Sequence, residues 1–331
     1  MNNKPLSESR FCSSFGKFIE KVEKSDIKPT YFETLVAFAF WQFSQSKVDY
    51  AVIEVGLGGL LDGTNVMHRQ DKVCVITDID YDHTSTLGKT LEAIAAQKAG
   101  IIQPHTAVFS YEQNDEVMGV LREASRQQQA ELHEVWPLKD TELPENLPLF
   151  QRRNWYLAYS VVEYLTTRDN FKALGEAGLE KSTHAYIPAR MEQQELAGHT
   201  LIMDGAHNPQ KFQMLMKSVA HAYPDAPLAC MVSFVRTKQA KVRDSLQALV
   251  PYCSHLIITS FAQDSMGKTS IDPLKIAEQC EELGFENWEI IHDPIQAYKK
   301  LLKRPEPLLL ISGSFFLLNY VRPYIKKEQP T

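Results

Sequence analysis

Five apolar runs, each followed by a segment of helical character, constrain the fold of the C-terminal part of this chain most strongly. The runs are Thr200–Met203, Leu228–Ser233, His255–Thr259, Trp288–Ile291 and Leu308–Ile311. Short runs of this kind that alternate with helices are typical of parallel sheets, because each parallel connection needs a crossover element. The sequence therefore predicts an α/β domain with a Rossmann-like, mostly parallel sheet over residues 198–331.

The N-terminal half alternates less regularly but indicates a second α/β domain. Val48–Ile53 is almost continuously apolar, which predicts a central strand covered on both faces. Lys72–Ile79 predicts a neighbouring strand, and Tyr31–Ser44 has so few polar positions that a buried helix is expected. We expect this domain to occupy residues 1–186 and to be joined to the next through a hinge at residues 187–197.

Composition narrows the class of protein. The chain has 331 residues, 44% of them hydrophobic and 23% charged, which is ordinary for a globular enzyme. Its net charge of −6 disfavours nucleic acid or an anionic membrane as a partner. The five cysteines are scattered without a C-x-x-C pair, and Met1–Arg10 lacks the apolar core of a signal peptide. We expect a cytoplasmic protein without disulfides.

Polar residues follow both predicted N-terminal strands. Glu54 ends the first, and three glycines behind it allow close approach of backbone to a ligand. The second strand stops in a polar cluster of Asp78, Asp80, Asp82 and His83. Because α/β sheets bind ligands at the carboxyl ends of their strands, this pattern predicts a metal or metal–phosphate site. A solvated acid at Glu54 stays open, and residue type alone makes Lys98 a lysine that complements a helix dipole.

The segment MDGAHNPQ carries the sharpest local signal of the C-terminal domain. Asp204 follows a predicted strand, Gly205 permits a tight turn, and Asn208–Pro209 has the composition of a helix start. Backbone N–H groups at such a start favour an anion such as a phosphate. The alternative is a capped turn in which Asp204 and His207 are incidental.

No phosphate-binding P-loop is present in the sequence. Ala262–Thr269 lies between a predicted strand and helix and ends in Gly-Lys-Thr, but alanine stands where the loop requires its first glycine. Nucleotide-site features therefore occur without the cradle that usually holds the phosphates.

Eight motifs together resemble one family. They are TYFE at Thr30–Glu33, EVGLGGLLDGTN at Glu54–Asn65, DHTSTLG at Asp82–Gly88, QKAGII at Gln97–Ile102, QRRN at Gln151–Asn154, PAR at Pro188–Arg190, DGAHNP at Asp204–Pro209 and SGSFF at Ser312–Phe316. In this order they resemble folylpolyglutamate synthase, which in many bacteria is also a dihydrofolate synthase, a branch of the Mur ligase superfamily. The resemblance implies a P-loop-type ATPase domain, truncated here, followed by the ligase domain.

The resemblance also implies a chemistry. These ligases transfer the γ-phosphate of ATP to a carboxylate of the folate's glutamate tail, and the amine of an incoming L-glutamate attacks the acyl phosphate. Both steps concentrate negative charge, which divalent cations offset. The implied cofactors are ATP and Mg²⁺, the implied substrates are tetrahydrofolyl glutamate and L-glutamate, and we expect a monomer.

Site residues are carried over from the matching motifs alone. The implied magnesium ligands are Glu54, His83 and a carbamylated Lys98. The implied catalytic residues are Lys98 and His207. The segment Leu61, Asp62 and Gly63 is implied to line the pterin pocket. The implied ATP-binding residues are Asn154, Arg190 and Asp204.

The sequence departs from the family at its beginning. The family starts with a strand and a GTNGKGS-type P-loop, whereas this sequence starts after them. For the chain as given we therefore expect ATP hydrolysis to be lost. Two alternatives stay open beside the polyglutamylating ligase: a dihydrofolate synthase that couples dihydropteroate to glutamate, and a catalytically inactive folate-binding homologue.

Overall fold

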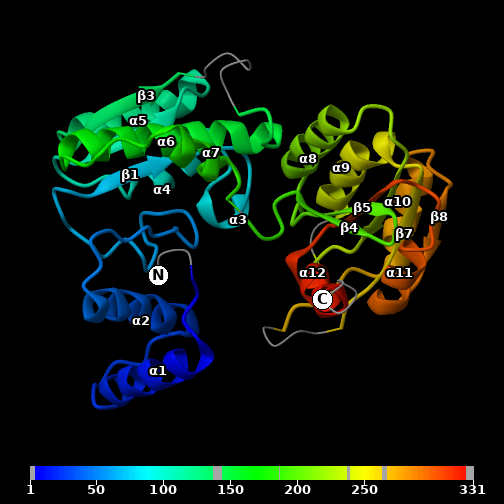
Figure 1. Cartoon of the computed structure of the whole chain (residues 1–331), viewed down its shortest axis with the longest axis horizontal. Coiled ribbons are helices and arrows are strands. Elements are labelled where there is room, and N and C mark those ends of the chain that lie inside the picture. Colours follow the sequence, from blue (N-terminus) through cyan, green and yellow to red (C-terminus); the bar gives the residue numbers. More distant parts are fainter. Residues whose placement is uncertain (1–3, 137–143, 186, 237–238, 263–266, 326–331) are drawn as a thin grey trace. The chain divides into compact units, whose positions relative to one another are not determined.

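The computed structural model of the chain describes residues 4–136, 144–185, 187–236, 239–262 and 267–325. Its contacts divide the chain into two compact units, Met1–Pro137 and Leu138–Thr331 (Figure 1). This division lies earlier in the chain than the predicted hinge at 187–197, and it assigns two further helices to the second unit. The limits that we predict for the domains remain a prediction.

The second unit contains the predicted parallel sheet. Its strands are β4 (Glu192–Leu196), β5 (His199–Met203), β6 (Leu228–Val232), β7 (His255–Ile258), β8 (Trp288–Ile290) and β9 (Leu308–Ser312). They lie in the order β4-β5-β9-β6-β7-β8, and every pairing except β4 with β5 is parallel. All five predicted strands of this part are confirmed. The residues of the predicted hinge include β4, whose backbone pairs antiparallel with β5 from Glu192 opposite Met203 to Leu196 opposite His199.

Helices cover both faces of this sheet, and neighbouring strand residues point to opposite faces. One core contains Ile202 of β5 and packs α8 (Pro209–Ala222), α9 (Gln239–Leu249) and α10 (Pro273–Glu282). The other contains Leu201 and packs α11 (Pro294–Leu301) and α12 (Phe315–Ile325). Helix α6 (Leu149–Arg168) packs on α8, α7 (Glu176–Thr183) follows it, and Val250–Tyr252 form a 3₁₀ turn. Among the described helices, none is long and apolar enough to cross a membrane.

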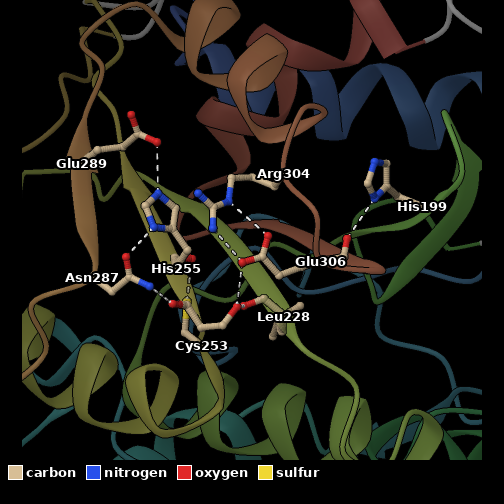
Figure 2. Close-up of polar contacts among 9 residues, drawn as sticks. His199, Leu228, Cys253, His255, Asn287, Glu289, Arg304 and Glu306 are labelled. Atoms are coloured by element: carbon tan, nitrogen blue, oxygen red, sulfur yellow. Dashed lines mark hydrogen bonds and ion pairs between the residues drawn. The ribbon is translucent and has the colours of Figure 1, made fainter.

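A polar network closes the amino ends of the parallel strands (Figure 2). Arg304 donates two hydrogen bonds to the carboxylate of Glu306, at 3.0 and 2.8 Å, and Ser254 donates a third at 3.0 Å. His255 at the start of β7 places one ring nitrogen 2.8 Å from Asn287 and the other 3.0 Å from Glu289. These contacts join β7, β8 and β9 at the end of the sheet opposite the carboxyl ends, so they serve the fold rather than ligand binding.

The first unit is built on a three-stranded parallel sheet. Strands β1 (Val73–Ile76), β2 (Ala107–Tyr111) and β3 (Glu131–Val135) lie in that order. One core joins the sheet to α4 (Leu91–Ala99) and α5 (Asp115–Gln127), beside the short α3 (Thr84–Leu87). Helices α1 (Glu8–Glu23) and α2 (Tyr31–Ser46) pair through a cluster of aromatic rings around Phe38.

The predicted strand Val48–Ile53 is wrong. These residues form no strand in the described part of the chain, and Val52 is 96% exposed. A strand persists only where a neighbour accepts its backbone hydrogen bonds, and an apolar run cannot reveal whether that neighbour exists. Strand β1, predicted as its partner, is instead an edge strand of the described sheet.

The prediction of a buried helix at Tyr31–Ser44 is correct in type but wrong in burial. Helix α2 buries only Phe38 and Gln42, and Tyr31 at its start is 76% exposed. Its first turn is fixed by a capping box, in which Thr30 and Glu33 bond each other's backbone N–H groups. The Thr and Glu of the TYFE motif thus cap the start of α2.

The glycine-rich loop after residue 55 packs on the end of α4. Leu60 N–H donates to the carbonyl of Gln97 at 2.7 Å, and Asn65 donates to the carbonyl of Gly100 at 2.9 Å. Gly59 has φ 145°, and a Cβ there would lie 2.9 Å from the Gln97 oxygen. Gly100 has φ −60°, so it is required by the close approach of Leu60 and not by a left-handed cap. The loop is therefore held to the helix that carries Lys98.

We predict that Gly59→Ala destabilises the first unit by about 1–3 kcal/mol through backbone strain, with a further cost from the collision with Gln97. Native-state hydrogen exchange of the β2 amides measures this free energy. The matched control is Gly119→Ala, because Gly119 is in the exposed middle of α5 with open space around its Cα. That change should stabilise by about 0.5–1 kcal/mol. Equal behaviour of the two variants would contradict the packing described for the loop.

Candidate functional site

Asp204 occupies the carboxyl end of β5 and is only 5% exposed. One carboxylate oxygen accepts from the backbone N–H of Met191 and the other from that of Ala206, each at 2.7 Å. Burial raises the pKa of Asp204 to about 6, although these two hydrogen bonds and the charges of Arg190 and Lys211 oppose the shift. A carboxyl that changes protonation near neutral pH at the end of a sheet strand is a strong candidate for ligand binding.

Arg190 extends over an aromatic ring beside this carboxyl. Its guanidinium carbon is 5.0 Å from the centre of the Phe315 ring, close enough for a cation–π interaction. Gly205 lies against the same ring, since a Cβ at that position would be 2.3 Å from Phe315 Cζ. The turn glycine predicted after the strand is thus required by packing against Phe315.

His207 also lies near Phe315, with the two ring centres 6.2 Å apart. Its Nδ1 is 2.8 Å from the carbonyl oxygen of Gly205, and its Nε2 is 3.2 Å from Lys211 Nζ. Because a carbonyl can only accept, Nδ1 carries the proton and Nε2 presents its lone pair to the lysine. The structure therefore brings His207 and a cation together at the start of α8, where Asn208 caps the helix as predicted.

Asn154 is exposed on α6, one helical turn after Gln151. The amide of Gln151 donates to the backbone carbonyl of Arg190 at 2.8 Å. Residues three apart lie on one face of a helix, so Asn154 belongs to the face that Gln151 directs at Arg190. Arg190 and His207 therefore lie near Phe315. Asp204 is joined to them through its bond from Met191 and through Gly205, which packs on the ring, and Asn154 lies on the face of α6 from which Gln151 bonds Arg190.

Lys98 lies in the last turn of α4 and is partly buried. Desolvation lowers its pKa, and the charge of Asp82 opposes that shift, so the two side chains are electrostatic neighbours. Burial favours the uncharged amine, which is the form that reacts with carbon dioxide. The environment of Lys98 is therefore compatible with a carbamate and differs from that of a solvated lysine at a helix end.

Glu54 and His83 are accessible side chains. His83 has φ 50°, precedes α3, and keeps its ring 56% exposed at 4.0 Å from the carboxylate of Asp82. Glu54 is exposed and does not end a strand, which corrects the reason for which it was singled out. Over the ranges that the structure describes, no three His, Cys, Asp or Glu side chains are grouped so as to hold a metal.

The segment predicted to contact a pterin combines a structural and an exposed residue. Asp62 accepts from the N–H and hydroxyl of Thr64, at 2.9 and 2.6 Å, and from the N–H of Leu57 at 2.8 Å. Burial opposes its ionisation, but these hydrogen bonds prevail and lower its pKa. Leu61 is 90% exposed, and Gly63 lies beside the ring of Phe32. Asp62 thus shapes the loop, while Leu61 is free to contact a ligand.

Sequence reasoning missed two contributors to this site. Phe315 was visible only as part of the SGSFF motif, and no periodicity marks it as the ring on which Arg190 and Gly205 rest. Lys211 is an ordinary residue of an amphipathic helix in sequence. Its position on the first turn after Asn208, four residues from His207, is the one signal that could have identified it.

Two family models match the chain in sequence order. The Mur ligase middle domain matches residues 10–141, and the Mur ligase glutamate ligase domain matches residues 189–315. The second match begins at the turn that precedes Arg190 and ends at Phe315, so it contains the constellation around Asp204.

Curated relatives carry related names. The chain is 24% identical to the dihydrofolate synthase/folylpolyglutamate synthase of Bacillus subtilis, over 98% of this chain and 80% of that protein. It is 32% identical to the mitochondrial folylpolyglutamate synthase of Bos taurus, over 66% of this chain and 43% of that protein. The chain thus spans less than half the length of the bovine relative.

Solved structures show the same fold. The folylpolyglutamate synthase of Thermotoga maritima aligns with a TM-score of 0.79 at 24% identity, covering 100% of this chain and 79% of that one. A bifunctional folylpolyglutamate synthase/dihydrofolate synthase of Yersinia pestis, complexed with AMPPNP and a Mn ion, aligns with a TM-score of 0.81 at 23% identity, covering 98% and 77%. With both Mur ligase domains matched in order, the chain belongs to the folylpolyglutamate/dihydrofolate synthase family of the Mur ligase superfamily.

Proposed function

We propose that this chain acts as an ATP-dependent ligase that joins L-glutamate to the γ-carboxylate of tetrahydrofolyl glutamate through an acyl phosphate. One observation carries the proposal: Arg190 and His207 lie near Phe315, and the buried Asp204 bonds the turn of Arg190, all inside the region that matches the glutamate ligase domain. The printed names of the Bacillus and bovine relatives support the substrate class.

The second unit supplies nucleotide-binding groups in this proposal. The Asp204 carboxylate is a hydrogen-bond acceptor suited to sugar hydroxyls, and Arg190 and Lys211 provide positive charge for phosphates. His207 Nε2 accepts from Lys211, which holds the ammonium at the start of α8 with further N–H groups to donate. Asn154 contributes an amide that can bond a base or a ribose. Each role is chemically matched to its group.

A divalent cation, Mg²⁺ in our proposal, would be held in the first unit by Glu54, His83 and carbamylated Lys98. The donor chemistry fits, because a carboxylate, an imidazole and a carbamate supply oxygen and nitrogen ligands that such cations accept. The accessibility of Glu54 and His83 leaves both available. When bound, the cation would offset the negative charge of the phosphates. The Yersinia structure with AMPPNP and a Mn ion supports a nucleotide–metal requirement.

Carbamylation of Lys98 follows from the chemistry of a desolvated amine. The Nζ lone pair attacks the carbon of CO₂, a C–N bond forms while a C=O π bond opens onto oxygen, and one proton leaves to solvent. The product is an anion where a cation stood. Asp82 would then face a like charge, which the positive charge of a divalent cation would offset.

The remaining parts of the proposal concern the setting of the protein. We propose a cytoplasmic monomer. The net charge of −6 supports the absence of a nucleic-acid or anionic-membrane partner. Leu61, in the exposed loop, remains our proposed contact for the pterin.

The proposed activity is tested by incubating the full chain with ATP, MgCl₂, labelled L-glutamate and either tetrahydrofolyl glutamate or dihydropteroate. Label in the folate product with one ADP per glutamate added would establish this activity and overturn the expectation from the sequence that ATP hydrolysis is lost. Product from dihydropteroate alone would assign the dihydrofolate synthase alternative. Folate binding without product and without ADP would assign the inactive homologue and contradict the proposal.

Asp204 should make the stability of the second unit depend on pH. Its folded pKa of about 6 lies above the ordinary 3.8, so the protonated form is favoured by folding and its contribution is lost as pH rises through about 6. That contribution amounts to about 3 kcal/mol. Hydrogen exchange of β6 and β9 in wild type and Asp204→Asn, from below pH 3.8 to pH 7.5, measures it as the difference between their pH profiles. Parallel profiles would contradict the buried carboxyl, and nucleotide affinity should fall in the variant.

Lys98 should carry a carbamate that no other lysine near it carries. With ¹³C-bicarbonate we expect a carbamate resonance that disappears in Lys98→Ala and persists in Lys89→Ala, because Lys89 is exposed and Lys98 is desolvated. Short carboxylates such as acetate should restore part of the activity of Lys98→Ala, whereas Lys98→Arg should stay inactive. A wild-type spectrum from Lys98→Ala, or full activity of Lys98→Arg, would refute the assignment.

A further inference from the structure

The turn that presents Arg190 is strained on both sides of that residue. Ala189 has φ 57° and Met191 has φ 49°, and both are non-glycine residues in the left-handed region. Side chains with a Cβ rarely adopt this conformation unless the surroundings enforce it. The contacts that enforce the turn therefore decide where the Arg190 guanidinium lies.

Two of these contacts tie the turn to the site. The N–H of Met191 donates to Asp204 at 2.7 Å, and the N–H of Gly205 donates to the carbonyl of Ala189 at 2.9 Å. The turn and the Asp204 segment thus hold each other, and a shift in one moves the other.

The third contact comes from a side chain with no other place in the site. The N–H of Ala189 donates at 2.9 Å to Oε2 of Glu192, the first residue of β4. That carboxylate also accepts two bonds from Arg322 of α12, at 2.8 and 2.7 Å, and is 8% exposed in its side chain. The paired arginine fixes the carboxylate bidentately, so the carboxylate in turn fixes the backbone of the turn.

We propose that Glu192, fixed by Arg322, is a positioning residue that enforces the strained turn at residues 189–191 and thereby sets Arg190 and Asp204 for nucleotide. The inference rests on the proposed function in assigning those two residues to nucleotide. It adds residues that lie outside the site itself, on β4 and α12.

The requirement is for a carboxylate and not merely for a polar group. Glu192 accepts from Ala189 N–H and from both terminal nitrogens of Arg322, so each oxygen faces a donor. A glutamine amide would turn an NH₂ donor toward one of these donors and lose at least one bond. Replacing glutamate by glutamine should therefore free the turn while leaving the shape of the side chain unchanged.

The experiment compares full-length wild type, Glu192→Gln and Arg322→Lys with the control Glu195→Gln. Glu195 is an exposed acid of the same strand, bonded to Thr200. Two quantities are measured: AMPPNP affinity in the presence of MgCl₂, and the titration of the Asp204 carboxyl by ¹³C NMR. Hydrogen exchange of β6 and β9 checks that the sheet is intact.

We expect Glu192→Gln to weaken AMPPNP binding roughly tenfold to a hundredfold. The titration midpoint of Asp204 should move upward from about 6, because the bond from Met191 is lost. Arg322→Lys should give a smaller change of the same sign, since lysine keeps the charge but not the bidentate geometry. The control should match wild type in both quantities.

Two outcomes separate the failure of this inference from failure of the proposed function. Wild-type AMPPNP affinity and an unchanged Asp204 midpoint in a folded Glu192→Gln variant would overturn the positioning role. If wild type itself binds no nucleotide, the proposed function fails, and the Asp204 midpoint still decides whether Glu192 holds the turn. If Glu192→Gln does not fold, Arg322→Lys decides by the same two measurements.

Discussion

The buried carboxylate of Asp204 is the interaction on which the candidate site depends. It joins the turn before β4 to the turn after β5, because it accepts backbone bonds from Met191 and from Ala206 at the carboxyl end of β5. A carboxyl in this position would be unfavourable without donors, and the two N–H groups that satisfy it belong to the turns that carry Arg190 and His207. Satisfying one buried acid thereby arranges two further functional side chains.

The two ends of the parallel sheet of the second unit differ in their polar side chains. At the amino ends, His255 bonds Asn287 and Arg304 bonds Glu306 (Figure 2). These polar side chains therefore bond to each other. At the carboxyl ends, Gly205 packs against Phe315 and Gly313 against the backbone of Ser233. The charged side chain of Arg190 lies over the Phe315 ring, which is exposed. The candidate site therefore lies at the carboxyl ends of the parallel strands, where α/β sheets bind their ligands.

The sequence predicted the second unit well and the first unit poorly, for a physical reason. Buried parallel strands such as Leu228–Val232 are apolar throughout, and each is flanked by a helix that starts with a recognisable cap, so local pattern and fold agree. The run Val48–Ile53 has the same local pattern but lacks a pairing neighbour in the described chain, which no local pattern reports. The sequence does not predict β4, because this edge strand is polar at every position except Leu196. The site residues were found through motifs, whereas Phe315, Glu192 and Arg322 act through tertiary contacts that sequence spacing does not encode.

Lys98 marks the limit of reasoning from residue type. A lysine in the last turn of a helix complements the dipole, and nothing in its own sequence neighbourhood argues otherwise. What changes the interpretation is tertiary structure: Gly59 and Leu60 pack against the backbone carbonyls of Gln97 and Lys98 at the end of α4. The amine itself is desolvated by burial, with Asp82 as its charged neighbour. The glycine loop therefore packs on the same helix end whose lysine is buried, so the tertiary contacts of Lys98, and not its sequence neighbourhood, decide whether it can lose its charge.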